Sequence, residues 1–117
     1  MEKLNELHSL HKMPGKPYVS YRIPQIYHTG VCIYFMIGMS VKGIDEPEEK
    51  FSKIEHILRE VIIKNGGSIS HHHGVGKLRK DFLPNTLSET SMQLVQELKL
   101  AHDPQNIFGA KNGILAK

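Results

Sequence analysis

Three consecutive histidines, His71-His72-His73, are the residues of this chain whose types and spacing best fit chemistry. Gly66-Gly67 precedes them, and Gly74 and Gly76 follow. An imidazole has the unperturbed pKa nearest to neutrality, so it can take up and return protons at physiological pH. Glycines on both sides permit tight turns and leave the main chain open to a planar or phosphorylated ligand. The segment therefore predicts proton transfer beside a bound ligand.

Two other interpretations of the histidines stay open. A metal ion would need a further ligand, and His56 or His102 is only a sequence-distant candidate. The spacing matches no zinc motif, so we predict no metal site. The rings could also be structural, satisfied by backbone hydrogen bonds in a solvated loop. If the segment is extended, alternation turns His71 and His73 to one side and His72 to the other.

Tyr34 is the second candidate, and it lies in the apolar run from Val31 to Met39. By pattern alone an aromatic residue in such a run is more often core than catalyst. A buried tyrosine hydroxyl nevertheless needs a hydrogen-bond partner, which a ligand could provide. Cys32, the one cysteine of the chain, excludes an intrachain disulfide, and we expect it to be buried and inert.

Composition limits the partners of the chain. Its 117 residues carry a formal net charge of +3, with basic residues scattered apart from Lys77, Arg79 and Lys80. This is a weak footprint for a polyanion, so we predict no nucleic acid. Arg22 and Lys77 could meet a phosphate group, but a surface charge is the simpler explanation of each. No apolar run approaches the roughly 18 residues of a membrane span, and no signal peptide is visible.

The elements ahead of the histidines follow from periodicity. We expect a short helix in residues 1–12 and two strands, 18–27 and 31–39, joined as a hairpin around His28-Thr29-Gly30, with Pro24 at an edge or bulge. The second strand is expected to be a buried central strand. Asp45 and Glu48 form a capping-box pattern for the next helix, which Asn65-Gly66 ends. Its expected apolar face comprises Phe51, Ile54, Ile57, Leu58, Val61 and Ile62.

Beyond that helix, residues 68–70 are expected to be extended and to return beside an earlier strand. The predicted class is α+β, a mainly antiparallel sheet with helices on one face. Residues 77–83 should form one or two helical turns stopped by Pro84. Thr86 and Glu89 suggest a capping box for a helix to about residue 101. Its expected stripe is Met92, Val95 and Leu98, followed by a loop at Asp103-Pro104 and a turn at Asn112-Gly113.

The histidine segment also resembles a known signature. Flavoproteins related to vanillyl-alcohol oxidase carry a carboxy-terminal signature, which in their 2-hydroxyacid dehydrogenase branch usually reads Gly-Gly-Ser/Thr-Ile-Ser/Gly-Gly-Glu-His-Gly-Ile-Gly. Here His71-His72-His73 replaces the Gly-Glu-His core, and with the following Gly-Val-Gly-Lys-Leu-Arg-Lys it is similar to the alkylglycerone-phosphate synthase branch of that family. The block Cys32-Ile33-Tyr34-Phe35 and the tail Asp103-Pro104-Gln105-Asn106-Ile107-Phe108-Gly109 resemble two further family segments, in family order.

The resemblance implies an enzyme that uses flavin adenine dinucleotide (FAD) to exchange the acyl chain of acyl-dihydroxyacetone phosphate for a long-chain fatty alcohol. It assigns His71, His72 and His73 to the flavin face as bases and positioners, with Gly74 also contacting the cofactor. It assigns Tyr34 to proton transfer with the leaving fatty acid and the incoming alcohol. At His28 the family usually has an acidic residue, which leaves a role there open.

The resemblance further implies a peroxisomal enzyme, although no targeting signal is visible in the chain, and it is compatible with a homodimer and with association with a membrane surface. We expect residues 1–117 to be a single C-terminal cap and active-site fragment whose FAD-binding domain is absent. Two alternatives remain: a fragment of an FAD-dependent 2-hydroxyacid dehydrogenase, against which the missing Gly-Glu-His speaks, and a non-catalytic module derived from such an enzyme.

Overall fold

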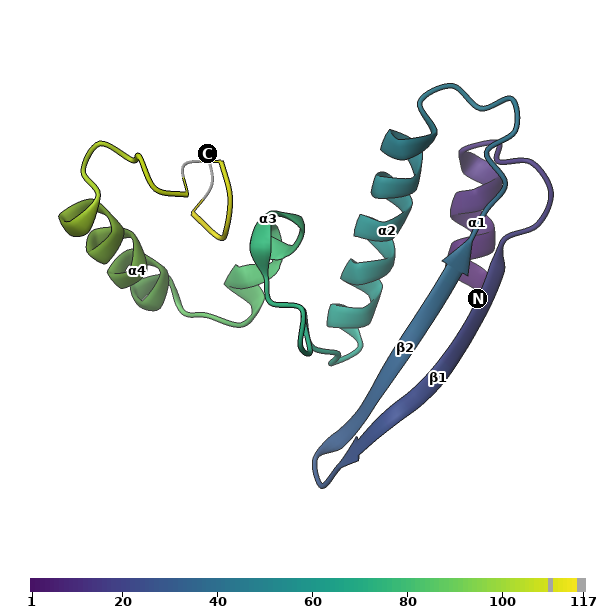
Figure 1. The fold of residues 1–117 in the computed structure, drawn as a ribbon. Helices are drawn as coiled ribbons and strands as arrows, with labels where there is room; N and C mark the ends of the chain where they lie inside the picture. The colour runs from purple at the N-terminus through teal and green to yellow at the C-terminus, as the bar shows by residue number, and fades with distance from the viewer. Residues whose placement is uncertain (110, 116–117) are drawn as a thin grey trace. The chain divides into compact units, whose positions relative to one another are not determined.

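The computed structural model describes residues 1–109 and 111–115 (Figure 1). The elements in chain order are α1 (Glu2–Leu10), β1 (Tyr18–Tyr27), β2 (Gly30–Gly38), α2 (Pro47–Lys64), α3 (Gly76–Arg79), the 3-10 helix η1 (Lys80–Asn85) and α4 (Glu89–His102). Helices together with an antiparallel sheet confirm the predicted α+β class. The chain divides into two compact units, Met1–Arg59 and Glu60–Lys117, and each is described by itself.

The first unit contains the predicted hairpin. β1 and β2 pair antiparallel, with Tyr27 opposite Gly30 at the turn. The register shifts between Arg22 and Gln25, where residues 23 and 24 of β1 oppose the single residue 33 of β2. Pro24 has no N–H to donate to a ladder, so a bulge is where a strand tolerates it. The predicted place of Pro24 is therefore confirmed.

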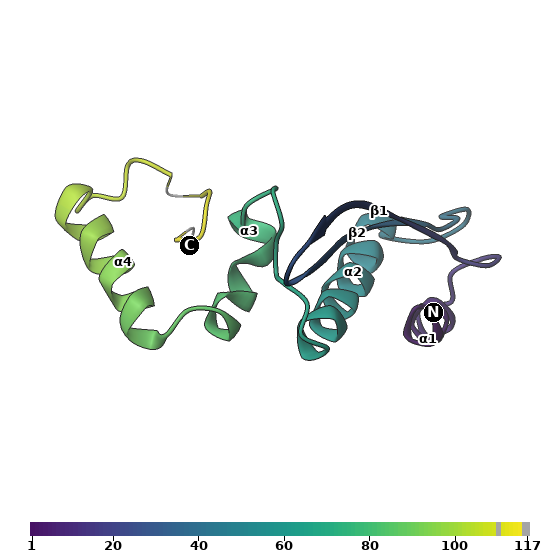
Figure 2. The same ribbon diagram turned by 90° about the horizontal axis from the view of Figure 1, so that it is seen from below.

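Helices α1 and α2 pack on the hairpin through one apolar cluster (Figures 1 and 2). Its buried members are Leu4, Leu7, Met13 and Ile54. Val19 and Ile37, which face each other across the ladder, pack against this cluster. Leu4 and Leu7, three residues apart in α1, thus point inward, whereas Leu10, at the end of the helix, is exposed.

The predicted burial of the second strand is wrong. Cys32 is the one buried residue of β2, while Val31, Ile33, Phe35 and Met36 are exposed. A strand is buried only where other layers and strands cover it, and here the described residues form a two-stranded sheet. Apolar composition alone does not supply that cover. The burial expected for Cys32 itself is confirmed, with 7% of its surface exposed.

Helix α2 begins and ends by backbone chemistry. It starts at Pro47, whose fixed φ suits the first helical position, and the Glu46 carbonyl accepts the first helical hydrogen bond from Lys50. The predicted cap at Asp45 is therefore wrong. At the other end Gly66 has φ +82°, and the N–H groups of Gly66 and Gly67 donate to the carbonyls of Ile63 and Ile62, each at 2.9 Å. This is a Schellman motif, as the predicted Asn65-Gly66 ending requires.

The second unit has its own core of Ile69, Phe82 and Leu83, against which Ile63, Val75, Met92 and Ile114 pack. Residues 68–75 form no strand, so the predicted return beside an earlier strand is wrong. The reason is local: the Ser68 hydroxyl donates to the Ser70 carbonyl at 2.7 Å and accepts from the Ser70 N–H. Such serine bonds compete with a ladder for the same backbone groups.

The helices after the histidines differ from prediction in detail. Pro84 lies inside η1 and does not stop the helical turns. The cap of α4 is Ser88, whose side chain accepts from the Ser91 N–H at 3.2 Å, while the predicted cap, Thr86, donates its hydroxyl to the Leu83 carbonyl. Leu98, expected on the buried stripe of α4, is exposed. At the predicted Asn112-Gly113 turn the chain bends, and Gly113 has φ +76°.

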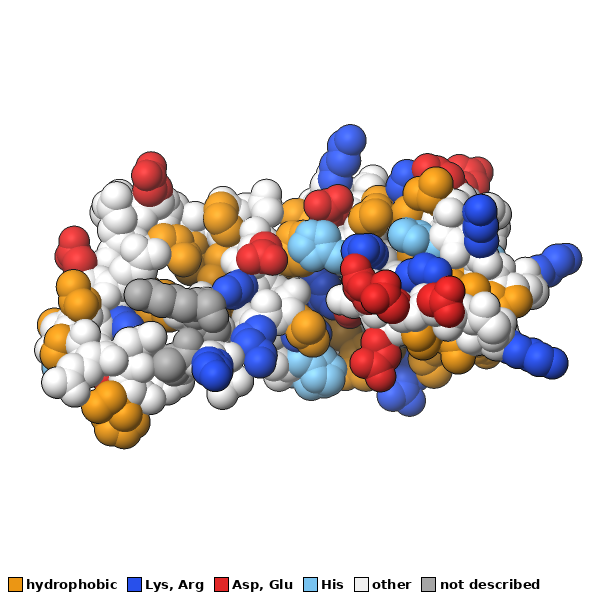
Figure 3. Space-filling view, turned by 90° about the horizontal axis from the view of Figure 1, so that it is seen from above, with side chains coloured by type: hydrophobic (Ala, Val, Ile, Leu, Met, Phe, Trp, Pro, Cys, Tyr) orange, Lys and Arg blue, Asp and Glu red, His pale blue; other side chains and the backbone are white. Residues whose placement is uncertain are grey.

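The surface mixes side-chain types. On the face shown in Figure 3, exposed hydrophobic side chains lie among basic and acidic ones. Exposed large hydrophobic residues occur in both units, for example Ile26 in β1 and Phe108 after α4. None of the helices in the described residues has the length and apolar character that crossing a membrane requires.

Candidate functional site

The histidines lie in a short loop that is closed at both ends. Ile69 is anchored in the core before the loop, and Val75 is half-buried after it. The Ser70 hydroxyl donates to the Gly74 carbonyl at 2.9 Å, and Arg79 of α3 donates to the same oxygen at 3.2 Å. Gly74 has φ +73°, a conformation that favours glycine. These bonds fix the ends of a loop whose three imidazoles are exposed to solvent.

The three rings contact one another in sequence. Nδ1 of His71 lies 3.0 Å from Nδ1 of His72, with the rings edge to face at 84°. The ring centroids of His72 and His73 are 4.0 Å apart at 34°. The predicted alternation of His71 and His73 against His72 does not hold, because the loop is not extended and the rings form one group. His72 is the central member, in contact with both neighbours.

This grouping favours the neutral form of its central ring. Partial desolvation lowers the pKa of His72, and the positive charges that His73 and His71 would carry lower that pKa further. The bond between the two Nδ1 atoms needs one donor and one acceptor, so at least one of the two rings must be neutral. The lowered pKa favours the neutral form of His72, which is the form that can accept a proton.

The loop leaves room for a planar group. A side chain placed at Gly74 or Gly76 would meet nothing within 4 Å, so the backbone there is open to solvent. Open main chain beside exposed imidazoles suits a flat, polar ring system.

Within residues 1–109 and 111–115, no group of three or more His, Cys, Asp or Glu side chains is arranged to hold a metal ion.

Tyr34 lies in β2 of the first unit and is half-buried, whereas the histidines belong to the second unit. The Arg22 guanidinium lies over the Tyr34 ring, with its carbon 5.1 Å from the ring centroid. Sequence reasoning weighed Arg22 only as a phosphate contact and missed this pairing. The signal that could have found it is Pro24, since the bulge there sets which residue of β2 faces Arg22.

The other candidates have plainer surroundings. Lys77 in α3 and His28 in the hairpin turn are exposed.

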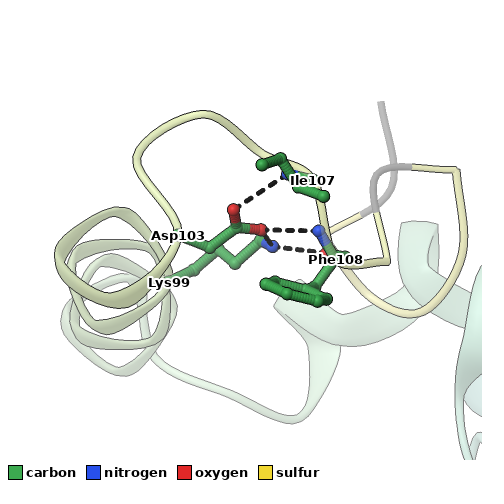
Figure 4. Close-up of polar contacts among 4 residues, drawn as sticks. All are labelled: Lys99, Asp103, Ile107 and Phe108. Atoms are coloured by element: carbon green, nitrogen blue, oxygen red, sulfur yellow. Dashed lines mark hydrogen bonds and ion pairs between the residues drawn. The ribbon is translucent and has the colours of Figure 1, made fainter.

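The tail that resembled a family motif is held by Asp103, whose carboxylate accepts from the N–H groups of Ile107 and Phe108 and from Lys99 (Figure 4). Beside it, residues of α4 and the tail line an open hollow of about 500 Å³. No sequence argument predicted either the network or the hollow.

Comparison with known families supplies the deciding observation. The sequence profile of the family described as FAD linked oxidases, C-terminal domain, matches residues 4–112. The chain belongs to this family. The flavoprotein resemblance and the predicted cofactor class, FAD, are thereby confirmed at the level of the family.

Individual relatives of this FAD-linked family refine the comparison. The chain is 42% identical over 91 residues to the alkyldihydroxyacetonephosphate synthase of Caenorhabditis elegans, covering 78% of this chain and 15% of that protein. It is 29% identical over 85 residues to the enzyme of the same name from Dictyostelium discoideum, covering 73% and 14%. Glycolate oxidase subunit GlcD of Bacillus subtilis is 30% identical over 64 residues, covering 52% and 14%. The chain thus spans about one seventh of the length of these relatives.

Proposed function

We propose that this chain is the C-terminal cap and active-site part of an alkyldihydroxyacetonephosphate synthase. The observation that carries the proposal is the exposed group of three contacting imidazoles, with the pKa of its central member lowered. The synthases of C. elegans and D. discoideum among its relatives support the reaction class. The open backbone at Gly74 fits a planar cofactor, so His71, His72, His73 and Gly74 would contact FAD. Bound there, FAD would supply the electrophilic ring system that the exchange requires.

The proposed reaction converts acyl-dihydroxyacetone phosphate and a long-chain fatty alcohol into alkyl-dihydroxyacetone phosphate and a fatty acid. A proton must leave the carbon undergoing substitution and later return to it. His72, whose lowered pKa favours the neutral imidazole, would accept that proton, with His71 and His73 positioning its ring. The Tyr34 hydroxyl would exchange a proton with the departing carboxylate and the incoming alcohol.

Two further expectations belong to this proposal. The chain by itself should be inactive, because its match covers only 15% of the C. elegans synthase and the flavin-binding region would come from outside residues 1–117. The whole enzyme should be peroxisomal, an expectation that rests on its similarity to the synthases and that localisation of the tagged full-length protein would check.

A chimaera provides the test. This chain would replace the matching segment of the C. elegans synthase, and fatty acid release from acyl-dihydroxyacetone phosphate would be measured. His72→Ala and Tyr34→Phe should each lower turnover by roughly 10²–10⁴, the contribution of general acid–base groups. His102→Ala and Tyr18→Phe are matched controls at exposed positions and should leave turnover unchanged. Wild-type turnover in both His72→Ala and Tyr34→Phe would refute the assigned roles.

A 2-hydroxyacid dehydrogenase is the second candidate, favoured by the similarity to glycolate oxidase subunit GlcD over about half of the chain. The two reactions differ in electron balance. Alkyl exchange leaves the cofactor in its starting oxidation state, so it needs no external acceptor. Reduction of a dye by glycolate or lactate, without fatty acid release, would identify the dehydrogenase instead.

A further inference from the structure

We propose that Arg22 is a positioning residue that holds the Tyr34 ring in place for proton transfer. The inference rests on the proposed role of Tyr34 and extends it to a residue in the opposite strand. Arg22 and Tyr34 are direct cross-strand partners, and the guanidinium carbon lies 5.1 Å from the ring centroid.

The bulge creates this pairing. From the turn to Gln25, the residue numbers of partners add to 57, as in Tyr27 with Gly30. Continued without interruption, that register would put Arg22 opposite Phe35. Phe35 follows Tyr34 in β2, so its side chain and that of Tyr34 lie on opposite faces of the sheet. The extra residue at 23–24 shifts the register by one and brings Arg22 to Tyr34. Bulges in other proteins re-aim side chains next to active sites in this way.

Nothing in the described residues competes for Arg22. Its guanidinium forms no ion pair with any carboxylate there, and the Tyr34 ring is its partner. A cation over an aromatic face is attracted to the electron density of the ring, and the stacked guanidinium also blocks ring movement on that side. The phenol oxygen lies on the line from Cβ through the ring, so rotation of the ring about this line leaves the oxygen in place. A tilt of the line moves the hydroxyl relative to any substrate. Arg22 therefore acts through Tyr34 and needs no contact with substrate.

The test compares three variants in the chimaera with the C. elegans synthase. Arg22→Met keeps the length and apolar stem but removes the cation, and should lower kcat about 3- to 30-fold, corresponding to a cation–π contact of about 0.7–2 kcal/mol, with KM nearly unchanged. Arg22→Lys keeps a cation over the ring and should recover most of kcat. Arg22→Met combined with Tyr34→Phe should be no slower than Tyr34→Phe alone. Arg59→Met, which removes an arginine paired with Glu55 on α2, is the control and should be neutral.

A second measurement does not depend on activity. In the chain labelled at tyrosine, Arg22→Met should shift the NMR signals of the Tyr34 ring, identified by their loss in Tyr34→Phe, and Arg59→Met should not. Unchanged ring signals, wild-type kcat in Arg22→Met, or losses that multiply in the double variant would each overturn the proposal. If Tyr34→Phe slows turnover and Arg22→Met does not, the positioning role alone fails. If Tyr34→Phe itself leaves turnover unchanged, the proposed role of Tyr34 fails and the positioning role fails with it.

Discussion

Oδ1 of Asp103 accepts a hydrogen bond of 2.8 Å from the backbone N–H of Ile107, four residues further along the chain. Its second oxygen accepts from the N–H of Phe108 at 2.9 Å and from the Lys99 ammonium (Figure 4). One carboxylate that is only 8% exposed thus ties the last turn of α4 to the following tail. The bond from Lys99 lowers the pKa of Asp103 most, with the two backbone bonds adding to the effect and burial opposing it.

We predict that Asp103→Asn releases this tail. An amide offers one acceptor oxygen where the carboxylate offers two, and its NH₂ group cannot accept from an N–H. The backbone amides of Ile107 and Phe108 should therefore exchange with solvent deuterium faster, whereas Asp81→Asn, at an exposed position, should change neither. Because the pKa is lowered in the folded chain, the stabilisation is complete above the ordinary aspartate pKa and is lost as pH falls through the lowered value. Protection that is insensitive to Asp103→Asn would contradict the assignment.

His72 should take up its proton at a lower pH than an ordinary histidine. Partial desolvation and the charges of its two neighbours lower the pKa of His72, so in an NMR titration this ring should protonate at a lower pH than an ordinary histidine. His73→Asn removes one of the two neighbouring charges, so the pKa of His72 should rise toward the ordinary value. His28→Asn, in the exposed hairpin turn, should leave it in place. In the chimaera with the C. elegans synthase, the acid limb of the rate profile should move in the same direction as the pKa of His72.

Gly67 should tolerate no side chain. A Cβ placed there would lie 2.4 Å from Cγ2 of Ile62 and 2.9 Å from its carbonyl oxygen. Gly67→Ala should therefore cost roughly 1–3 kcal/mol of unfolding free energy through overpacking, measured by urea denaturation. Gly30→Ala is the matched control, because a Cβ at that position meets nothing within 4 Å. Ile62→Ala in the Gly67→Ala background should recover part of the loss but leave the contact with the carbonyl. Equal stability of the two single variants would show that Gly67 is not tightly packed.

His8 should be replaceable with a gain in stability. It is 4% exposed, and its Nε2 has no hydrogen-bond partner in the described residues. An unsatisfied buried polar atom costs about 1–3 kcal/mol, and a leucine of similar volume carries none. His8→Leu should raise the unfolding free energy by roughly 1–2 kcal/mol in mildly alkaline buffer. His11→Leu, just beyond α1, should change it by less than about 0.5 kcal/mol. A loss of stability in His8→Leu would indicate that Nε2 binds a water molecule.

Local sequence patterns predicted where the helices and strands lie. Which of their apolar residues are buried depends on packing between elements, which those patterns do not specify. The two-residue turn between Tyr27 and Gly30 and the glycine ending of α2 follow from residue chemistry alone. Burial of β2 did not, since the same apolar run is compatible with a covered strand and with an uncovered one. Ile63 replaced Ile62 as an inward-facing residue near the end of α2, where a second core begins.

For the site, the sequence indicated which residues to consider but not their arrangement. The ring-to-ring order of the histidines depends on serine and arginine bonds to the Gly74 carbonyl, which have no periodic signature. The pairing of Arg22 with Tyr34 depends on a register shift of one residue, and whether Pro24 produces a bulge or an edge is settled only by the neighbouring strand. The functional roles of His71, His72, His73 and Tyr34 stay predictions.

The long hairpin of β1 and β2 also determines how this polypeptide behaves in the test tube. Within the described residues each strand pairs with one neighbouring strand, so no further strand covers its outer edge. The same strands expose large apolar side chains such as Ile26 and Phe35. An uncovered strand edge with exposed apolar side chains favours pairing with strands of other chains. Preparations of the chain should form intermolecular β-structure and light-scattering particles as concentration rises. We expect pairing of these edges with another polypeptide segment to reduce that aggregation.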